Sequence, residues 1–192
     1  DSAYMSRTLG TPTDPEKWTW SCWVKRCTFG AAHSLISYDS GSNLLEYIRF
    51  NSDDKLKWNH RTSGGTTYKL ETNRVFRDPS AWLNIVIAYD SSQGTDSNRV
   101  KMYINGTQET SFANADYPAQ DVDSELNKAQ AVSLYRWDAG SEYFDGYIAE
   151  NVFCDGQAYA ASDFGEFDED SPTIWKPKDV SGLTFGTNGF YL

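Results

Sequence analysis

Apolar and polar residues alternate along much of this chain, which is the period-2 pattern of β-strands. In residues 17–27, the alternation places Trp18, Trp20, Cys22 and Val24 on one face of a predicted strand. Residues 44–50 and 56–61 flank a polar turn at 52–54 and predict a hairpin. In its second strand, Leu56, Trp58 and His60 share one face.

A nearly continuous apolar run at residues 78–92 is typical of a strand buried on both faces. Residues 100–104 lead into Asn105-Gly106, a tight-turn pair, because both residues tolerate positive φ. Residues 146–156 predict a strand that alternates regularly from Tyr147 to Cys154, with Glu150 on the same face as Ile148, and Asp155-Gly156 as the turn that ends it.

Two segments lack strand periodicity. Residues 114–128 predict a long surface loop, and Ser162 is expected to cap a short helical turn. The pattern as a whole gives about ten short strands at roughly 8–12-residue spacing, which predicts an all-β antiparallel sandwich or barrel.

The length of 192 residues, with no linker-like stretch, predicts a single domain spanning residues 1–192. Both ends look cut, so we expect a domain excised from a larger protein. A net charge of -10 argues against nucleic acid and anionic membranes as partners. No apolar run approaches the ~20 residues of a membrane span, so no membrane insertion is expected.

The three cysteines are Cys22, Cys27 and Cys154, an odd number that makes a poor disulfide framework. We expect free thiols, with Cys22 and Cys154 serving as small core residues. The chain has no CxxC motif, and its two histidines lie far apart in sequence, so a zinc site is not expected.

The segment AWLNIVIAYDSSQGTDSNRVKMYINGTQ, residues 81–108, resembles the laminin-G-like, concanavalin A-like jelly-roll family. The matching positions are Trp82, Tyr89, Asp90, Tyr103, Asn105 and Gly106. The resemblance implies an all-β, concanavalin A-like jelly-roll sandwich of two antiparallel sheets.

The C-terminal residues 146–192 are similar to tail-fibre and other virion proteins of tailed phages and related viruses. The matching positions are Glu150, Asp155, Gly156, Phe164, Gly165, Trp175, Pro177, Gly186, Asn188, Gly189 and Phe190. This similarity implies a location in the virion, on a tail fibre or the capsid surface, with neighbouring virion subunits as partners.

Acidic residues near the C-terminus do not predict catalysis. EFDED at residues 166–170 lacks the spacing and the apolar strand of a glycosidase motif, and Glu150 has no carboxylate two residues away. We therefore expect a structural clasp, in which Asp155-Gly156 turns the chain and Phe164, Phe167 and Trp175 pack a covering loop against the sandwich.

A sugar site needs an aromatic platform for C–H faces and fixed polar groups for hydroxyls. The best candidates occur in KWNHR and LYRWD, which would line one face if both lay on the same sheet. These candidates are Trp58, His60, Arg61, Tyr135, Arg136 and Trp137. Core packing is the competing interpretation for each aromatic residue.

Calcium is the one cofactor that the sequence raises, because the resembling domains often hold Ca²⁺ at the sandwich rim. A site needs 6–8 oxygen ligands from several loops. The candidate ligands are Asp121, Asp123, Asp138 and Asp145. None lies in a self-contained loop motif, so scattered surface carboxylates are the competing interpretation.

The sequence therefore predicts a non-enzymatic binding module of a virion protein that recognises a host-surface glycan. A structural module that contacts only neighbouring virion subunits is the alternative, and a glycoside hydrolase is a third possibility that the missing carboxylate pair disfavours.

Overall fold

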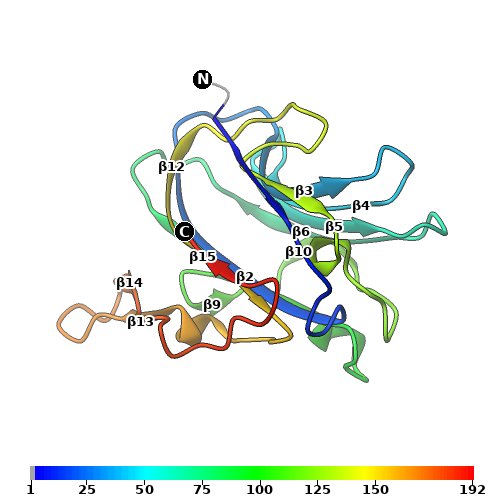
Figure 1. Ribbon diagram of the computed structural model, residues 1–192. Helices are drawn as coiled ribbons and strands as arrows, with labels where there is room; N and C mark the ends of the chain where they lie inside the picture. The colour runs from blue at the N-terminus through cyan, green and yellow to red at the C-terminus, as the bar shows by residue number, and fades with distance from the viewer. Residues whose placement is uncertain (1–2) are drawn as a thin grey trace.

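A computed structural model of the chain describes residues 3–192 and shows two antiparallel sheets packed face to face (Figure 1). In spatial order, the seven-stranded sheet consists of β1 (Met5–Thr8), β11 (Ala131–Leu134), β3 (His33–Asp39), β4 (Leu45–Phe50), β5 (Lys55–Arg61), β6 (Thr67–Val75) and β10 (Phe112–Asp116). The six-stranded sheet consists of β15 (Phe190–Tyr191), β12 (Gly146–Asp155), β2 (Lys17–Arg26), β7 (Leu83–Asp90), β8 (Val100–Ile104) and β9 (Thr107–Gln108). The remaining elements are the hairpin of β13 (Gly165–Phe167) and β14 (Trp175–Pro177) and the 3₁₀ helices η1 (Asp96–Asn98), η2 (Glu125–Asn127) and η3 (Ala161–Asp163). The predicted all-β sandwich is confirmed.

The core between the sheets follows the predicted alternation. The four apolar residues predicted to share a face of β2 are all buried there, and so are Leu56 and Trp58 of β5. Every residue of β7 is buried, as expected for a strand covered on both faces. The Asn105-Gly106 turn has φ values of 48° and 78°, which is the left-handed conformation that its residue types favour.

Several predicted boundaries are wrong. The expected loop at 114–128 begins with the last residues of β10 and later contains η2. Ser162 lies inside η3, and Ala160 precedes that helix. Strands β1, β13 and β14 were not predicted, because β1 is exposed throughout and the other two have only three residues each.

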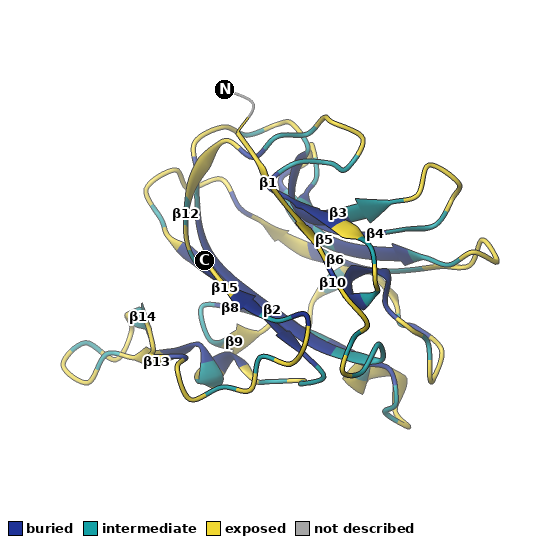
Figure 2. Cartoon of the chain, in the orientation of Figure 1, coloured by how far each residue is buried: buried dark blue, intermediate teal, exposed yellow. Residues whose placement is uncertain are grey.

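The C-terminal segment from residue 157 to 185 covers the outer face of the six-stranded sheet. Val86, Val152 and Cys154 of that face form a second apolar cluster with Ala161, Phe164 and Val180. Phe164 and Trp175 therefore pack against the sandwich as expected. Phe167 does not, because it is 48% exposed on the projecting β13–β14 hairpin (Figure 2).

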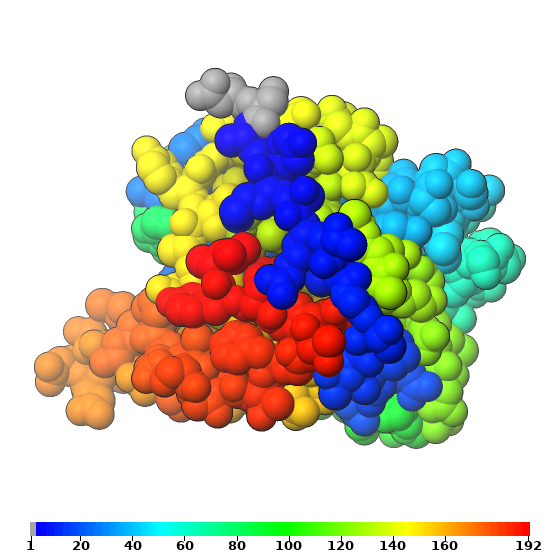
Figure 3. Space-filling model, in the orientation of Figure 1, coloured from blue at the N-terminus to red at the C-terminus, as the bar shows by residue number. Residues whose placement is uncertain are grey.

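The turn at Asp155 ties both ends of the chain to the sandwich. The buried Asp155 carboxylate accepts hydrogen bonds from the amides of Thr13 and Asn188, at 2.7 and 3.1 Å. Gly156 follows with a φ of 78°. Figure 3 shows the N-terminal segment in blue and the C-terminal segment in red lying side by side at the surface. The predicted turn at Asp155-Gly156 is therefore present, and the long-range bonds of the Asp155 carboxylate, which were not predicted, join both ends of the chain to it.

All three cysteines are free thiols. Cys22 and Cys154 are buried and pack as small core residues, whereas Cys27 is exposed. Over residues 3–192, no helix combines the length and the hydropathy that crossing a bilayer requires.

Candidate functional site

Three of the six predicted sugar contacts lie in the interior. Trp58 and His60 are fully buried on the inner face of β5, and Tyr135 is buried after β11. The indole Nε1 of Trp58 donates a 2.9 Å hydrogen bond to the buried Glu46 carboxylate. A sugar in solvent cannot reach these rings, so the structure assigns them to packing and corrects their prediction as sugar contacts.

The other three predicted residues are half-buried. β5 and β11 belong to one sheet, as the prediction required, but β3 and β4 lie between them. The Arg136 guanidinium carbon sits 3.5 Å from the ring centroid of Tyr4, and the Trp137 ring packs edge-on against Tyr47 at 5.1 Å. Arg61 lies at the far end of β5, opposite Leu45 of β4. The sheet therefore does not bring the two triplets together into one site.

The four predicted calcium ligands lie on two different loops. Asp121 and Asp123 are exposed before η2, and Asp145 is exposed before β12. Asp138 accepts hydrogen bonds from the Ser133 hydroxyl and the Asp39 amide. Within residues 3–192, no group of three or more His, Cys, Asp or Glu side chains is arranged to hold a metal ion. This donor set does not fit the 6–8 oxygens of a calcium site.

A β-bulge in β12 places Glu150 on the outer face of the six-stranded sheet. Ala149 pairs with Trp23 and Val152 with Ser21, so Glu150 and Asn151 together oppose one residue of β2. Glu150 takes a φ of 51° to make the bulge. The predicted regular alternation is wrong here, because the extra residue re-aims the side chains that follow. Asn151 turns inward and accepts a 2.9 Å hydrogen bond from Trp20 Nε1.

Glu150 borders a groove with three tryptophan rings. This tryptophan groove has a volume of about 360 Å³. Its lining consists of Trp23, Trp82, Ala149, Glu150, Trp175 and Pro177. Trp23 projects from β2, Trp82 precedes β7 and is 39% exposed, and Trp175 reaches in from β14. Three separate stretches of chain thus line one groove. Trp23 is only 8% exposed, so Trp82 and Trp175 supply most of the aromatic surface that solvent can reach.

The Trp175 ring is held in a narrow seat. A Cβ on Gly165 would lie 2.5 Å from its Cε2 atom, and a Cβ on Gly106 would also overlap the ring. Its Nε1 donates a 3.0 Å hydrogen bond to Asn84 Oδ1. Phe167 packs edge-on against it, with ring centroids 4.9 Å apart. These contacts fix the ring before any ligand arrives, which lowers the entropy lost on binding.

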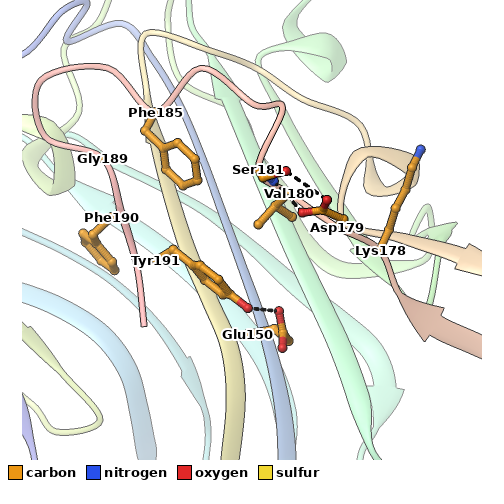
Figure 4. Close-up of a pocket in the computed structure, with 9 residues that line it drawn as sticks. All are labelled: Glu150, Lys178, Asp179, Val180, Ser181, Phe185, Gly189, Phe190 and Tyr191. Carbon is orange, nitrogen blue, oxygen red and sulfur yellow. Dashed lines mark hydrogen bonds between the residues drawn. The ribbon is translucent and has the colours of Figure 1, made fainter.

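A second hollow, with a volume of about 370 Å³, lies on the other side of Glu150 (Figure 4). Its lining consists of Glu150, Lys178, Asp179, Val180, Ser181, Phe185, Gly189, Phe190 and Tyr191. Glu150 lines both spaces, so the hollow and the tryptophan groove meet at its side chain. We refer to the two together as the Glu150 cleft.

The polar groups of this cleft are dominated by carboxylates. Tyr191 donates a 2.6 Å hydrogen bond to Glu150, and this bond, with burial and the negative charges of Glu150 and Asp179, raises the pKa of the Tyr191 hydroxyl. Asp179 accepts hydrogen bonds from the amide and the hydroxyl of Ser181, which hold the pKa of its carboxyl below the ordinary value. Both effects keep Tyr191 protonated and Asp179 ionised near neutral pH.

This arrangement offers contacts that a bound sugar can use. A glycosidase requires one carboxyl group with a raised pKa to protonate the leaving group. The pKa of Asp179 is lowered, and Tyr191 is a hydrogen-bond donor rather than a nucleophile. Flat indole faces beside fixed hydrogen-bond acceptors match the two needs of a sugar, its C–H faces and its hydroxyls.

Sequence reasoning missed the tryptophan groove because its rings come from distant parts of the chain. The sequence pointed to Trp82 through family resemblance and to Trp175 through the resemblance and the expected covering loop, but gave Trp23 no role. One signal was present in the sequence: Trp23 falls on the face opposite Trp18 and Trp20. A large aromatic residue on that face indicates either that another segment of the chain covers the face or that the face forms a binding surface.

A family model described as the concanavalin A-like lectin/glucanases superfamily matches residues 2–158. No curated protein matches the chain in sequence.

Several solved structures have a similar fold. Domains LG4-5 of the mouse laminin α1 chain align with a TM-score of 0.56 at 10% identity, covering 91% of this chain and 42% of theirs. The CBM40 of the Ruminococcus gnavus IT-sialidase bound to α2,3-sialyllactose aligns with a TM-score of 0.50 at 14% identity, covering 76% and 85%. Tailspike protein 2 of the Escherichia coli O157:H7 bacteriophage CAB120 aligns with a TM-score of 0.56 at 15% identity, covering 85% and 22%. At these identities, the likeness establishes the fold alone.

Proposed function

Since the chain belongs to the concanavalin A-like lectin/glucanase superfamily, we propose that it is a non-enzymatic module that binds glycan in the tryptophan groove. The observation that supports this function most directly is the convergence of Trp23, Trp82 and Trp175 on one solvent-open space beside Glu150. Aromatic faces of this kind stack on sugar rings, and the carboxylate accepts hydrogen bonds from hydroxyl groups.

Two similar structures support the choice of ligand and setting. The bacterial CBM40 is bound to sialyllactose, which supports a glycan as the class of ligand, and the tailspike protein comes from a bacteriophage. We propose accordingly that this domain belongs to a virion protein and recognises a host-surface glycan. In an oligomeric fibre, weak single sites would act together, and multivalency raises the overall affinity without new contacts.

A glycan array with the multimerised domain tests this function. Trp82→Ala removes an exposed ring of the groove, and we expect affinity for the best array ligand to fall about tenfold or more, since truncating an aromatic anchor costs about 2 kcal/mol. Trp137→Ala is the matched control, because it truncates a half-buried tryptophan of the sequence-predicted patch. Loss of binding in Trp137→Ala but not in Trp82→Ala would move the site to that patch. Release of reducing sugar from a bound polysaccharide would make the protein an enzyme.

The second candidate function is attachment to neighbouring virion subunits, and one observation favours it. The β13–β14 hairpin exposes two apolar side chains, with Phe167 48% and Ile174 56% accessible. Exposed apolar groups of this kind are typical of protein contacts. A Phe167→Ser/Ile174→Ser double variant that keeps glycan binding but fails to assemble into particles would support this candidate.

A further inference from the structure

The Glu150 cleft has a charge that its aromatic walls do not explain. Glu150 lies where its two parts meet, and Asp179 lines the second hollow. Within residues 3–192, no ammonium or guanidinium group lies within 4.0 Å of either carboxylate. Tyr191 and Ser181 donate hydrogen bonds to them but bring no positive charge.

The one cation on the rim does not neutralise these groups. Lys178 donates a hydrogen bond through its Nζ to the Ser162 carbonyl at 3.3 Å. Figure 4 shows this side chain directed away from the Glu150–Tyr191 pair. The cleft is therefore lined by aromatic and apolar surface, from Phe185, Phe190 and Tyr191, with two uncompensated negative charges set into it.

Such a lining discriminates among sugars by charge. A carboxylate or sulfate on the ligand would face like charge, whereas an ammonium group would face opposite charge over an aromatic surface, which also attracts cations. The net charge of -10 on the whole chain acts in the same direction at longer range.

We infer that the Glu150 cleft selects amino sugars, with a protonated amine seated at Glu150 and Asp179 and the pyranose ring stacked on the tryptophans. This inference rests on the proposed glycan-binding function and names the class of glycan. The positioning of Glu150 follows from the β-bulge, since a regular strand would point its side chain into the core. Glu150 also has a left-handed backbone conformation, and residues in such strained conformations are found preferentially at functional sites.

Titration calorimetry with three soluble probes tests the inference. These probes are an oligomer of glucosamine, the N-acetylglucosamine oligomer of the same length, and sialyllactose. We expect the glucosamine oligomer to bind more tightly than its acetylated counterpart, and sialyllactose to bind most weakly. Raising NaCl from about 0.05 M to about 0.5 M should weaken only the binding of the glucosamine oligomer, because salt screens exposed charges.

Glu150→Gln keeps the size of the side chain and removes its charge. It should lower affinity for the glucosamine oligomer about threefold to fivefold, the range of an exposed ion pair, and lower affinity for the acetylated oligomer by a clearly smaller factor, because the Gln carbonyl still accepts from sugar hydroxyls. Glu166→Gln is the matched control, because it makes the same change of net charge at an exposed position outside the cleft.

The outcomes separate this inference from the proposed function. If Trp82→Ala weakens binding of all sugars but Glu150→Gln and salt change nothing, the amine preference is wrong and the glycan site stands. Tighter binding of sialyllactose than of the glucosamine oligomer would also overturn the preference alone. If no sugar binds, or Trp82→Ala has no effect on any of them, both proposals fall.

Discussion

Asp155→Ala tests the clasp that ties the two chain ends to the sandwich. The side chain is fully buried and accepts four hydrogen bonds. Its Oδ2 atom accepts from the amides of Thr13 and Asn188, and its Oδ1 atom accepts from Asn127 Nδ2 and the Asp14 amide, at distances of 2.7, 3.1, 2.7 and 3.3 Å. The three segments that it joins are far apart in sequence.

The expected loss of stability follows from the N–H donors that Asp155→Ala leaves without an acceptor. Asn127 Nδ2 keeps two backbone carbonyl partners, of Asp14 and Lys17. Asn188 is buried and its amide has only Asp155, so leaving that donor unpaired costs about 1–3 kcal/mol, and the lost bonds from the Thr13 and Asp14 amides to a charged acceptor add to this cost. We therefore expect Asp155→Ala to lower the free energy of unfolding by about 3–5 kcal/mol, and Tm by roughly 6–20 °C, at about 2–4 °C per kcal/mol for a domain of this size.

The same carboxylate makes stability depend on pH. Burial would raise the pKa of Asp155, but the hydrogen bonds from Asn127, Thr13, Asn188 and Asp14 outweigh burial and hold it below 3.8. A lowered folded-state pKa means that this stabilisation is complete above the unfolded-state value and is lost as pH falls through the folded-state value. The stability difference between wild type and Asp155→Ala should therefore shrink below about pH 4.

Urea and thermal unfolding followed by circular dichroism measure these differences. Asp155→Asn should also destabilise, because its NH2 group would face two of these four N–H donors whichever way the side-chain amide is turned. Asp170→Ala, an exposed acid on the β13–β14 hairpin, is the control and should stay within about 0.5 kcal/mol of wild type. A loss below about 1 kcal/mol for Asp155→Ala, or equal losses at pH 3 and pH 7, would refute the clasp as a source of stability.

Two further predictions concern the site. Gly165→Ala places a Cβ 2.5 Å from the Trp175 ring, so we expect a loss of about 1–3 kcal/mol in unfolding free energy and weaker glycan binding. Gly182→Ala is the control, because nothing lies within 4 Å of its Cβ, and it should leave stability and binding unchanged. A result in which Gly165→Ala binds like wild type would show that the seat of Trp175 does not set the groove. Removing calcium with a chelator should leave glycan affinity and Tm unchanged, because the groove uses indole rings and Glu150; a drop in either on chelation, reversed by added Ca²⁺, would revive a calcium site.

The two-sheet architecture was predictable because local alternation decides which residues enter the core. Trp18 and Trp20 face inward, and β7 is buried on both sides, as their patterns indicate. The alternation of β12 predicted the wrong face for Glu150, because a bulge adds one residue to the strand and the sequence pattern does not show where a bulge occurs. The sequence also cannot tell whether a tryptophan such as Trp58 or Trp137 packs in the interior or offers its ring to a sugar.

The site was the less predictable part, because its geometry depends on long-range contacts. Trp175 reaches the groove across Gly106 and Gly165. Its Nε1 hydrogen bond to Asn84 spans 91 positions of sequence. Spacing within a short motif cannot predict a surface assembled in this way, whereas the family resemblances include Trp82, Glu150 and Trp175 among their matching positions but not Trp23.

The β13–β14 hairpin, which carries Trp175, has an exposed loop at its tip. Residues 168–174, between β13 and β14, are mostly exposed, whereas the seat of the ring lies behind them on Gly106 and Gly165. The tip can therefore lengthen, shorten or change its side chains while the indole stays where it is. Natural or designed changes in this loop could therefore alter the contacts at the outer edge of a bound sugar while the β-sandwich stays the same. Antibodies vary their binding loops on a constant framework in the same way.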